Sequence, residues 1–378
     1  MNLALPDIRY KLGRFVLTCI GLSLLLGVVI MMAGIFRGQT ADALALSQAI
    51  GADLWVVESG SKGPFAEASR IPGDTREMVR RIQGVEAAGS ITLQTVQVGS
   101  AGKPLRLQVV GFELGRPGGP KTLIAGRDII RSNYELIADR QTGLSLGDTL
   151  KLGRRVFTVV GLTSGNVTAS GDSVVYVTLR DAQFLQFELA PPATRRETAR
   201  GAIRTNTDLV NAVIARVSPH IPVEVIAGDI RRWKHLSALT AADQQTILTT
   251  AVIERASRQL GLFMSILTIV SAVIIALIIY TLTMDKLREI ATLKLIGAPD
   301  RTIIGLIVQQ ALLMGIIGFF GGTAFVFLGR GLFPKRVVLM AQDIGMLFAI
   351  VVIVCLLAST LGVRAALRVD PARALGGG

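Results

Sequence analysis

Histidines, cysteines and glycine–lysine turns are the places where this sequence could carry out catalysis or bind a nucleotide. The two histidines, His220 and His235, belong to no H-E-x-x-H pattern and have no cysteine partner, which argues against a zinc site. Gly99–Lys103 lacks the P-loop spacing, and Pro104 stands where a hydroxyl residue is needed. A G-x-S-x-G nucleophile motif is also missing. We therefore expect no catalytic residue, no metal site and no cofactor bound by this chain.

The charged residues with the most suggestive spacing lie in Asp285–Arg301 (DKLREIATLKLIGAPDR), between two long uncharged stretches. As a helix, this segment has apolar residues at every third position, which predicts one apolar stripe. The stripe consists of Leu287, Ile290, Leu293 and Ile296. Gly297 and Pro299 predict the end of this helix, and Asp300 is expected to cap the next one. We expect a soluble partner to hold this amphipathic segment; the alternative is a membrane-surface helix that only connects two spans.

Four uncharged stretches are long enough to cross a bilayer as helices. They predict spans at residues 15–36, 259–284, 302–329 and 344–363. A composition that is 51% hydrophobic and 18% charged, with a mean hydropathy of +0.54, also indicates a membrane protein. The first span is too long for a typical cleaved signal peptide, so we expect it to be retained. The absence of ionisable residues within the spans argues against an ion channel or a secondary transporter.

The glycines of the third span predict close helix packing, within one subunit or between two subunits. They are Gly315, Gly318 and Gly322.

Basic residues flank the spans unevenly and predict the topology. They place an N-terminal segment (1–14), the bridge (285–301) and a tail (364–378) in the cytoplasm. The opposite side then holds a short loop (330–343), which also carries basic residues, and a large domain (37–258). Residues 37–258 hold 27 Lys+Arg and 21 Asp+Glu and so contribute +6 of the net charge of +13. These charges are scattered, which favours a solvated surface over attraction to an anionic lipid or substrate, and we expect no nucleic-acid partner.

Within residues 37–258 the pattern predicts an extracytoplasmic α+β domain of two lobes. The predicted parts are a porter-like α+β lobe (about 51–123 with 200–230), a β-rich lobe (about 124–190) and stalk helices (37–50 and 240–258). Cys19 and Cys355 both lie in spans, so this domain has no disulfide.

Individual elements of this domain are predicted from local patterns. We expect strands at 53–58, 87–98, 105–111 and 223–226, and helices at 75–82 and 207–217. Asp74 and Glu77 have the spacing of a capping box for the first of these helices. Thr240–Met284 reads as one helix that continues into the second span.

The stretch REIATLKLIGAPDR (Arg288–Arg301) resembles the coupling segment of FtsX/MacB-type ABC transporter permeases, the type VII or mechanotransmission family. Leu146–Gly161 resembles the β-rich external segment of that family. Asp370–Leu375 (DPARAL) resembles its C-terminal DPAEAL, although Arg373 replaces the usual acidic residue. The resemblance covers the whole chain, in the order of one span, a large external domain and three spans.

This resemblance implies a homodimeric permease in the inner (plasma) membrane, with both termini in the cytoplasm. A separate cytoplasmic ATPase would bind ATP and Mg²⁺ and push on the bridge. The residues expected to couple to it are Lys286, Arg288, Glu289, Ile290, Thr292, Leu293, Lys294, Gly297 and Ala298. The long stalk would carry the movement to the external domain, which would expel or extract a lipidic or amphiphilic substrate.

The compact external domain also resembles the DevC type of permease, which implies a periplasmic adaptor and an outer-membrane channel as further partners. The alternative from another class is an FtsX-like signalling scaffold, which activates an extracytoplasmic hydrolase without transport.

Overall fold

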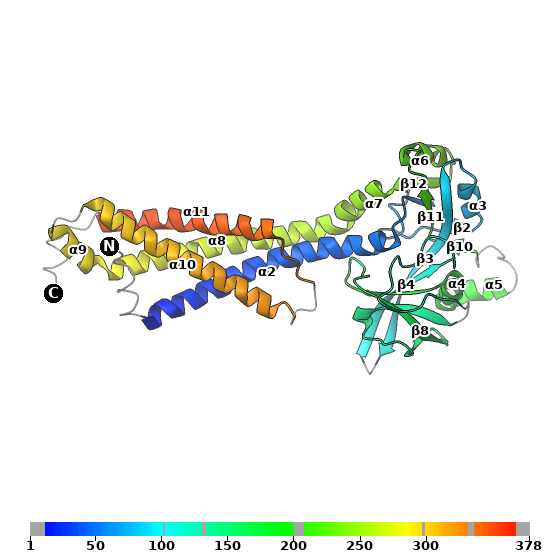
Figure 1. The fold of residues 1–378 in the computed structure, drawn as a ribbon, viewed down its shortest axis with the longest axis horizontal. Helices are drawn as coiled ribbons and strands as arrows, with labels where there is room; N and C mark the ends of the chain where they lie inside the picture. The colour runs from blue at the N-terminus through cyan, green and yellow to red at the C-terminus, as the bar shows by residue number, and fades with distance from the viewer. Residues whose placement is uncertain are drawn as a thin grey trace. The chain divides into compact units, whose positions relative to one another are not determined.

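The computed structural model describes residues 12–100, 103–130, 134–199, 208–296, 299–331 and 336–367. The chain forms two compact units, a helical unit (Met1–Gly38 with Ser257–Gly378) and an α/β unit (Gln39–Ala256) (Figure 1). The chain passes between them inside helix α2 (Leu12–Ile50) and inside helix α8 (Glu254–Asp285), so both crossings have helical backbone.

The helical unit confirms the four expected spans. Its other helices are α9 (Leu287–Leu295), α10 (Asp300–Gly329) and α11 (Ala341–Leu367). In the described part of the chain, four helices are long and apolar enough to cross a membrane. They cover Val16–Ile50, Arg258–Asp285, Asp300–Gly329 and Ala341–Arg364.

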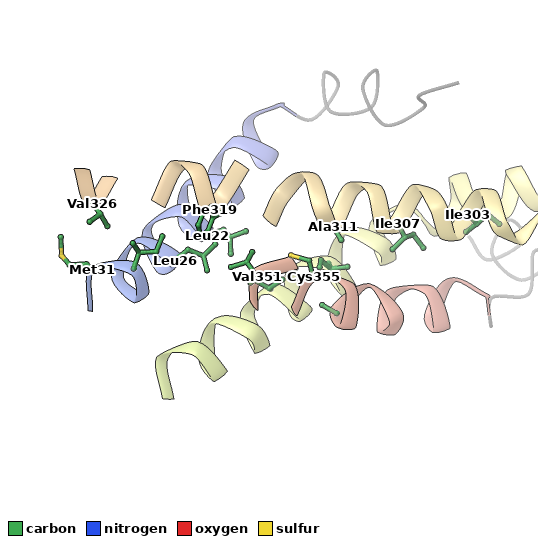
Figure 2. Packing of buried hydrophobic residues seen from close by; sticks show 14 of the residues in the cluster. Leu22, Leu26, Met31, Ile303, Ile307, Ala311, Phe319, Val326, Val351 and Cys355 are labelled. Atoms are coloured by element: carbon green, nitrogen blue, oxygen red, sulfur yellow. The ribbon is translucent and has the colours of Figure 1, made fainter. Parts of the chain in front are cut away.

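One buried cluster joins the helices of this unit. In Figure 2, Ile303, Ile307 and Ala311 follow one another along α10, near Val351 and Cys355 of α11. Leu22 and Leu26 extend the cluster from α2. Because all these side chains are apolar, the cluster gives the unit a continuous core without buried charge.

The α/β unit is built on one sheet of ten strands. The strand order is β12-β1-β11-β3-β4-β9-β6-β8-β5, and β7 pairs with β8. The strands of this sheet are β1 (Leu54–Glu58), β3 (Val85–Ser100), β4 (Lys103–Phe112), β5 (Ala125–Gly126), β6 (Glu135–Asp139), β7 (Thr149–Leu152), β8 (Arg155–Thr163), β9 (Ser173–Thr178), β11 (Ala212–Val217) and β12 (Leu236–Thr240). A short pair, β2 (Ile71–Pro72) with β10 (Leu209–Val210), lies apart from it.

Short helices complete the α/β unit. They are α3 (Thr75–Arg80), η1 (Arg140–Thr142), α4 (Leu179–Leu189), α5 (Pro192–Ala199), α6 (Val223–Arg231), α7 (Ala241–Ile247) and the π-helical η3 (Leu248–Ile253). The expected strands at 53–58, 87–98 and 105–111 are confirmed, because β1, β3 and β4 cover all of their residues except Asp53. The strands expected in two lobes join one sheet through β9, which pairs with both β4 and β6.

Two predicted elements are wrong. The predicted helix at 207–217 is mainly β10 and β11, with Thr207 outside the described residues. Strand β11 lies between β1 and β3 and is buried at almost every position, so it lacks the alternation that identifies a strand. The predicted strand at 223–226 is the first turn of α6, whose Ile226, Ala227 and Ile230 are buried at helical spacing.

Two predicted helix ends also differ from the structure. Asp74 has helical backbone angles (φ −68°, ψ −18°) and its side chain caps nothing, because a capping residue needs an extended backbone. A capping box is present instead at Thr240 and Asp243, at the start of α7. Asp300 is the first residue of α10 rather than its cap, and Pro299 precedes it. There its carboxylate lies in the first turn, where the helix dipole favours negative charge.

The predicted single helix Thr240–Met284 is helical from Ala241 onward, but it is not uniformly α-helical. Thr240 caps α7, and η3 separates α7 from α8 with six residues of π-helix. Thr249 Oγ1 donates to the carbonyl oxygens of Gln245 and Thr246, both at 2.9 Å. Such hydroxyl bonds to preceding carbonyls compete with the helical ladder and bend helices, which fits the irregular geometry.

Candidate functional site

Helix α9 is a nine-residue segment that begins directly after α8. Lys286 breaks the helical path with φ −101° and ψ 10°, and its N–H donates to the carbonyl of Thr283 at 3.1 Å. The Ile290 N–H then donates to the carbonyl of Lys286 at 2.9 Å, which opens the new helix. A hydrogen bond from the Ile296 N–H to Thr292 closes it at 3.1 Å. The bridge is therefore a separate short helix and not an extension of α8.

One side of α9 is fixed to the core of the helical unit. Ile290 and Ala291 are 4% and 1% exposed. Ile290 belongs to the same buried cluster as Ile303 and Ile307 of α10 and Ile279 of α8. Helix α9 is therefore attached through Ile290 to the apolar cluster that α8 and α10 also form.

The other end of α9 presents apolar side chains. Leu295 is 62% exposed and Ile296 is 78% exposed, whereas Ile290 is buried. The prediction of one apolar stripe is thus wrong for Ile290 and Ile296. Two residues three positions apart are separated by about 300° around an α-helix, which is about 60° short of a full turn. From Ile290 to Ile296 this shortfall occurs twice and adds to about 120°, so the two side chains lie on different faces of α9. Burying Ile290 therefore leaves Ile296 free for another contact.

The structure places the predicted coupling residues on more than one side of α9. Lys286 and Lys294 are half-buried, and Thr292 is exposed. Arg288, Glu289 and Leu293 belong to α9, but their side chains lie outside the described part, as do Gly297 and Ala298 altogether. The coupling role of all these residues stays a prediction. Ala291 and Leu295 were not among the predicted residues, because short-range spacing does not identify which turn meets α10.

The predicted packing glycines face two different helices of the same chain. A Cβ at Gly318 would lie 2.8 Å from Leu22 of α2, and one at Gly322 would lie 2.7 Å from the carbonyl oxygen of Ser23. A Cβ at Gly315 would collide with Cys355 of α11. Gly322 in particular lets the backbones of α2 and α10 approach closely.

An ion pair that the sequence did not suggest joins α2 to the start of α11. Arg37 Nη2 donates to Asp343 Oδ1 at 2.7 Å. Close by, the Val338 N–H donates to the carbonyl of Gly34 at 3.0 Å. These bonds attach the segment before α11 to α2.

In the α/β unit, the buried carboxyl of Asp181 lies close to Arg155, whose guanidinium stacks on the Phe184 ring. Asp181 Oδ2 accepts a hydrogen bond from Thr178 Oγ1 at 2.8 Å, and the Arg155 guanidinium lies 3.8 Å from the Phe184 ring centroid. Burial raises the pKa of Asp181, while bonds from Thr178 and the Tyr134 backbone and the charge of Arg155 oppose the rise. Among the residues that the structure describes, no group of three or more His, Cys, Asp or Glu side chains could hold a metal ion.

Comparison with known proteins identifies both parts of the chain. Residues 15–232 match a family model described as the MacB-like periplasmic core domain, and residues 261–371 match the FtsX-like permease C-terminal model. An uncharacterised ABC transporter permease of Mycobacterium bovis is 24% identical, with 99% of each chain covered. Another from Mycobacterium tuberculosis is 26% identical, also with 99% of each chain covered.

A putative hemin transport system permease protein of Staphylococcus haemolyticus is 20% identical and covers 100% of this chain and 99% of its own length. The periplasmic region of MacB from Actinobacillus actinomycetemcomitans aligns with a TM-score of 0.37 and 12% identity, over 53% of this chain and 94% of that one. Since the MacB-like model alone matches more than half of the sequence, the chain belongs to the FtsX/MacB-type family of ABC transporter permeases.

Proposed function

We propose that this permease transmits the ATP-driven movement of a separate ATPase to its α/β unit, and so exports or extracts a lipidic or amphiphilic substrate. The observation that carries this proposal is the attachment of α9. Ile290 and Ala291 hold the helix to the membrane core, while Leu295 and Ile296 stay exposed. A short helix that is fixed on one side and apolar on the other suits a groove on a soluble partner.

The route of transmission follows from the chain itself. The chain crosses from one unit to the other within α2 and within α8, and both crossings are helical. Helices are stiffer than loops, so a displacement of α9 passes into α8 with little loss. ATP and Mg²⁺ belong to the partner ATPase in this scheme. The bridge and both termini then lie in the cytoplasm of a cell whose inner membrane holds the four spans.

The substrate class is inferred from the apolar side chains of the membrane spans. The spans of α8, α10 and α11 carry mainly apolar side chains and no ionisable residue at their centres, which suits substrates that partition into lipid. The staphylococcal relatives are named for hemin transport, and hemin is itself an amphiphile. A periplasmic adaptor and an outer-membrane channel would complete an export path of the DevC type.

Helix α8 also favours a homodimer. Only 17% of its apolar window is buried within the chain, compared with 39% for α2 and for α10. Its exposed side includes Leu262, Phe263, Ile269 and Leu277. We expect a second copy to cover this side. Both native cysteines are buried, so Ile269→Cys should form a disulfide dimer in membranes, and Ile353→Cys on α11 serves as the matched control.

The test of the proposed function uses the permease and its ATPase, reconstituted in liposomes with a fluorescent lipid analogue. Charge reversal of Arg288 and Glu289 should release the ATPase while the permease stays folded. Arg232→Glu is the control, because its side chain is 83% exposed in the α/β unit. Undiminished ATPase binding in the double variant would refute the coupling role of α9. ATP hydrolysis coupled to movement of the α/β unit, without any transfer of the analogue, would favour the signalling scaffold instead.

A further inference from the structure

Strand β3 has a free edge along its second half. Its first half pairs with β11 from Val85 to Ile91, while β4 accompanies it over Ile91–Ser100 on the other side. Beyond Ile91, Asn211 takes the place of the missing neighbour: its backbone N–H donates to the Ile91 carbonyl at 2.9 Å, and its Oδ1 accepts from the Leu93 N–H at 2.8 Å. In the described chain, no strand pairs with this side of β3 after Leu93.

The direction of the backbone groups on this edge follows from the ladder. In an antiparallel pair, alternate residues direct their N–H and C=O groups to the same neighbour. The Leu93 N–H bonds away from β4, toward Asn211. Thr95, Gln97 and Gly99 therefore direct theirs outward as well, and all three residues are exposed. The edge offers a row of free donors and acceptors with the spacing that an added strand requires.

The edge lacks the features that normally prevent pairing. Exposed edge strands are usually protected by charged residues, proline or a bulge. The segment Leu93–Gly99 reads LQTVQVG and contains neither a charge nor a proline. Its pairing with β4 also continues without a register shift from Ile91 to Ser100. The hairpin of β3 and β4 is visible in Figure 1.

Two cavities flank this edge, one on each face of the sheet. The cavity on the α4 side has a volume of about 420 Å³ and includes Gln94, Gln183 and Phe187. The cavity on the opposite face, about 350 Å³, includes Leu46, Phe65 and Leu248. Leu93, Thr95 and Asn211 line both. Side chains of an added strand alternate between the two faces, so successive residues would enter one cavity and then the other.

The chemistry of the cavities indicates which side chains fit. Among the described residues, Arg70 is the charged residue that lines the α4-side cavity, and no described carboxylate lines it. Gln94 Oε1 is buried there and has no hydrogen-bond partner in the described part of the chain. An acidic side chain would pair with Arg70. The opposite cavity has an apolar wall in Leu46, Phe65 and Leu248, which suits a branched aliphatic side chain. The rest of its lining includes the charged residues Glu67, Arg106 and Asp172.

A second copy of this chain fits the edge less well than a different polypeptide. Paired with itself, the segment Leu93–Gly99 would place Gln94, Val96 and Val98 on one face and Leu93, Thr95 and Gln97 on the other. It contains no acidic residue, so it would bring no carboxylate to Arg70.

We propose that the free edge of β3 binds an extended segment of a partner polypeptide as an added strand, with aliphatic and acidic side chains alternating into the two cavities. This deepens the proposed function, since it gives the partner of the α/β unit a defined docking mode.

The test selects short random peptides, displayed on phage, on the full chain in lipid nanodiscs without the ATPase. A fluorescein-labelled synthetic copy of the most enriched peptide is then measured by anisotropy. We expect enriched peptides to alternate aliphatic and acidic residues. Thr95→Pro should weaken binding at least tenfold, because it removes an outward N–H yet leaves the bonds to β4 in place.

Matched variants separate this effect from damage to the hairpin. Thr95→Val also loses the bond from Thr95 Oγ1 to Gln108 Oε1 but keeps the N–H, and should bind within about twofold of the unmodified chain. Arg70→Glu should weaken binding about fivefold, and Arg232→Glu should leave it unchanged. An unaltered thermal transition in the fluorescence of Trp55 and Trp233 shows that Thr95→Pro is folded.

Three results would overturn the proposal: failure to enrich any peptide, equal binding to Thr95→Pro, and a change in oligomer mass caused by Thr95→Pro in light scattering. The last would mean that a second copy occupies the edge. Since the assay contains no ATPase, each of these results leaves the ATP-coupled function standing. Conversely, undiminished ATPase binding in the α9 variants would refute the coupling role of α9 but leave the peptide result standing.

Discussion

Truncating the two isoleucines of α9 should produce opposite defects, because the structure gives them opposite surroundings. Ile290 is 4% exposed and packs against α10 and α8, whereas Ile296 is 78% exposed. Ile290→Ala removes buried methyl groups and should cost about 2–5 kcal/mol of stability. Ile296→Ala has nearly no packing to lose in the free permease, so its stability should change by less than about 0.5 kcal/mol.

The binding defect should follow the reverse order. Full burial of an isoleucine contributes about 1.5–3 kcal/mol, and most of the Ile296 surface is still available for burial by a partner. Its loss should therefore weaken ATPase binding by about 1–2 kcal/mol, or roughly 5- to 30-fold. The Ile290→Ala variant should bind the ATPase with nearly normal affinity. Its ATP-driven transport should be slow, because α9 is less firmly packed against the core of the helical unit and transmits the movement of the ATPase poorly.

The two cysteines and the two tryptophans make the assay specific for each unit. Cys19 and Cys355 are buried in the helical unit, so a thiol-reactive dye reports its unfolding. Trp55 and Trp233 lie in the α/β unit and report that part separately. Ile290→Ala should lower the unfolding temperature reported by the thiol-reactive dye and leave the one reported by tryptophan fluorescence unchanged. Affinity for the ATPase is measured separately, by biolayer interferometry. If Ile296→Ala bound as tightly as the unmodified chain, the exposed end of α9 would not be the docking surface.

Two further changes test the packing of each unit. Gly322→Ala should destabilise the helical unit by about 1–3 kcal/mol in the thiol assay, since its Cβ would meet the backbone of α2 at Ser23 and Gly27. Gly305→Ala in the same helix meets no atom within 4 Å and should be neutral or stabilising by up to about 1 kcal/mol; equal loss in both would contradict this reading. Asp181→Asn should gain stability relative to the unmodified chain as pH rises from about 4 to 8 in the tryptophan assay. The folded-state pKa of Asp181 is raised, so the neutral carboxyl stabilises the fold below its unfolded pKa and that contribution is lost as pH rises through the folded value. A pH-independent difference would show that ionisation of Asp181 is not the cause.

The spans and the family could be predicted from the sequence because each depends on a local pattern. A bilayer needs about 20 apolar residues in a row, and such runs are visible without any knowledge of tertiary contacts. The hairpin of β3 and β4 was predicted for a similar reason, since exposed and buried residues alternate in the half of each strand that is next to the turn. Strand β11 was not, because burial on both faces removes that alternation.

The site was less predictable because its key features depend on distant residues. The charges of α9 predicted a helix apart from the spans. Its local sequence could not predict that Ile290 joins the buried cluster that contains Ile303, because this depends on the packing of α9 against the neighbouring helices. The free edge of β3 was missed for a different reason. It exists because β11 ends where β3 continues, and the length of one strand says nothing about the length of its neighbour.

The π-helical segment η3 provides the strictest test of transmission along the stalk. It lies at Leu248–Ile253, just before the chain enters the helical unit at Ser257, and Thr250 Oγ1 donates to the Thr246 carbonyl at 2.8 Å. A π-bulge holds one residue more than the α-helix that would replace it, so deleting Thr250 should restore α-helical bonding and leave the following residues in nearly the same orientation. Inserting one alanine after Glu254, in the α-helical part of the stalk, instead turns the following residues by about 100° relative to the preceding ones. Both units of the insertion variant should unfold at their normal temperatures in the thiol and tryptophan assays, while ATP-driven transfer should fall at least about tenfold, equivalent to about 1.4 kcal/mol of lost coupling. Thr250→Ala keeps the residue count and should transport normally. Normal transport by the insertion variant would mean that the stalk does not transmit the movement as a rigid body, whatever α9 binds.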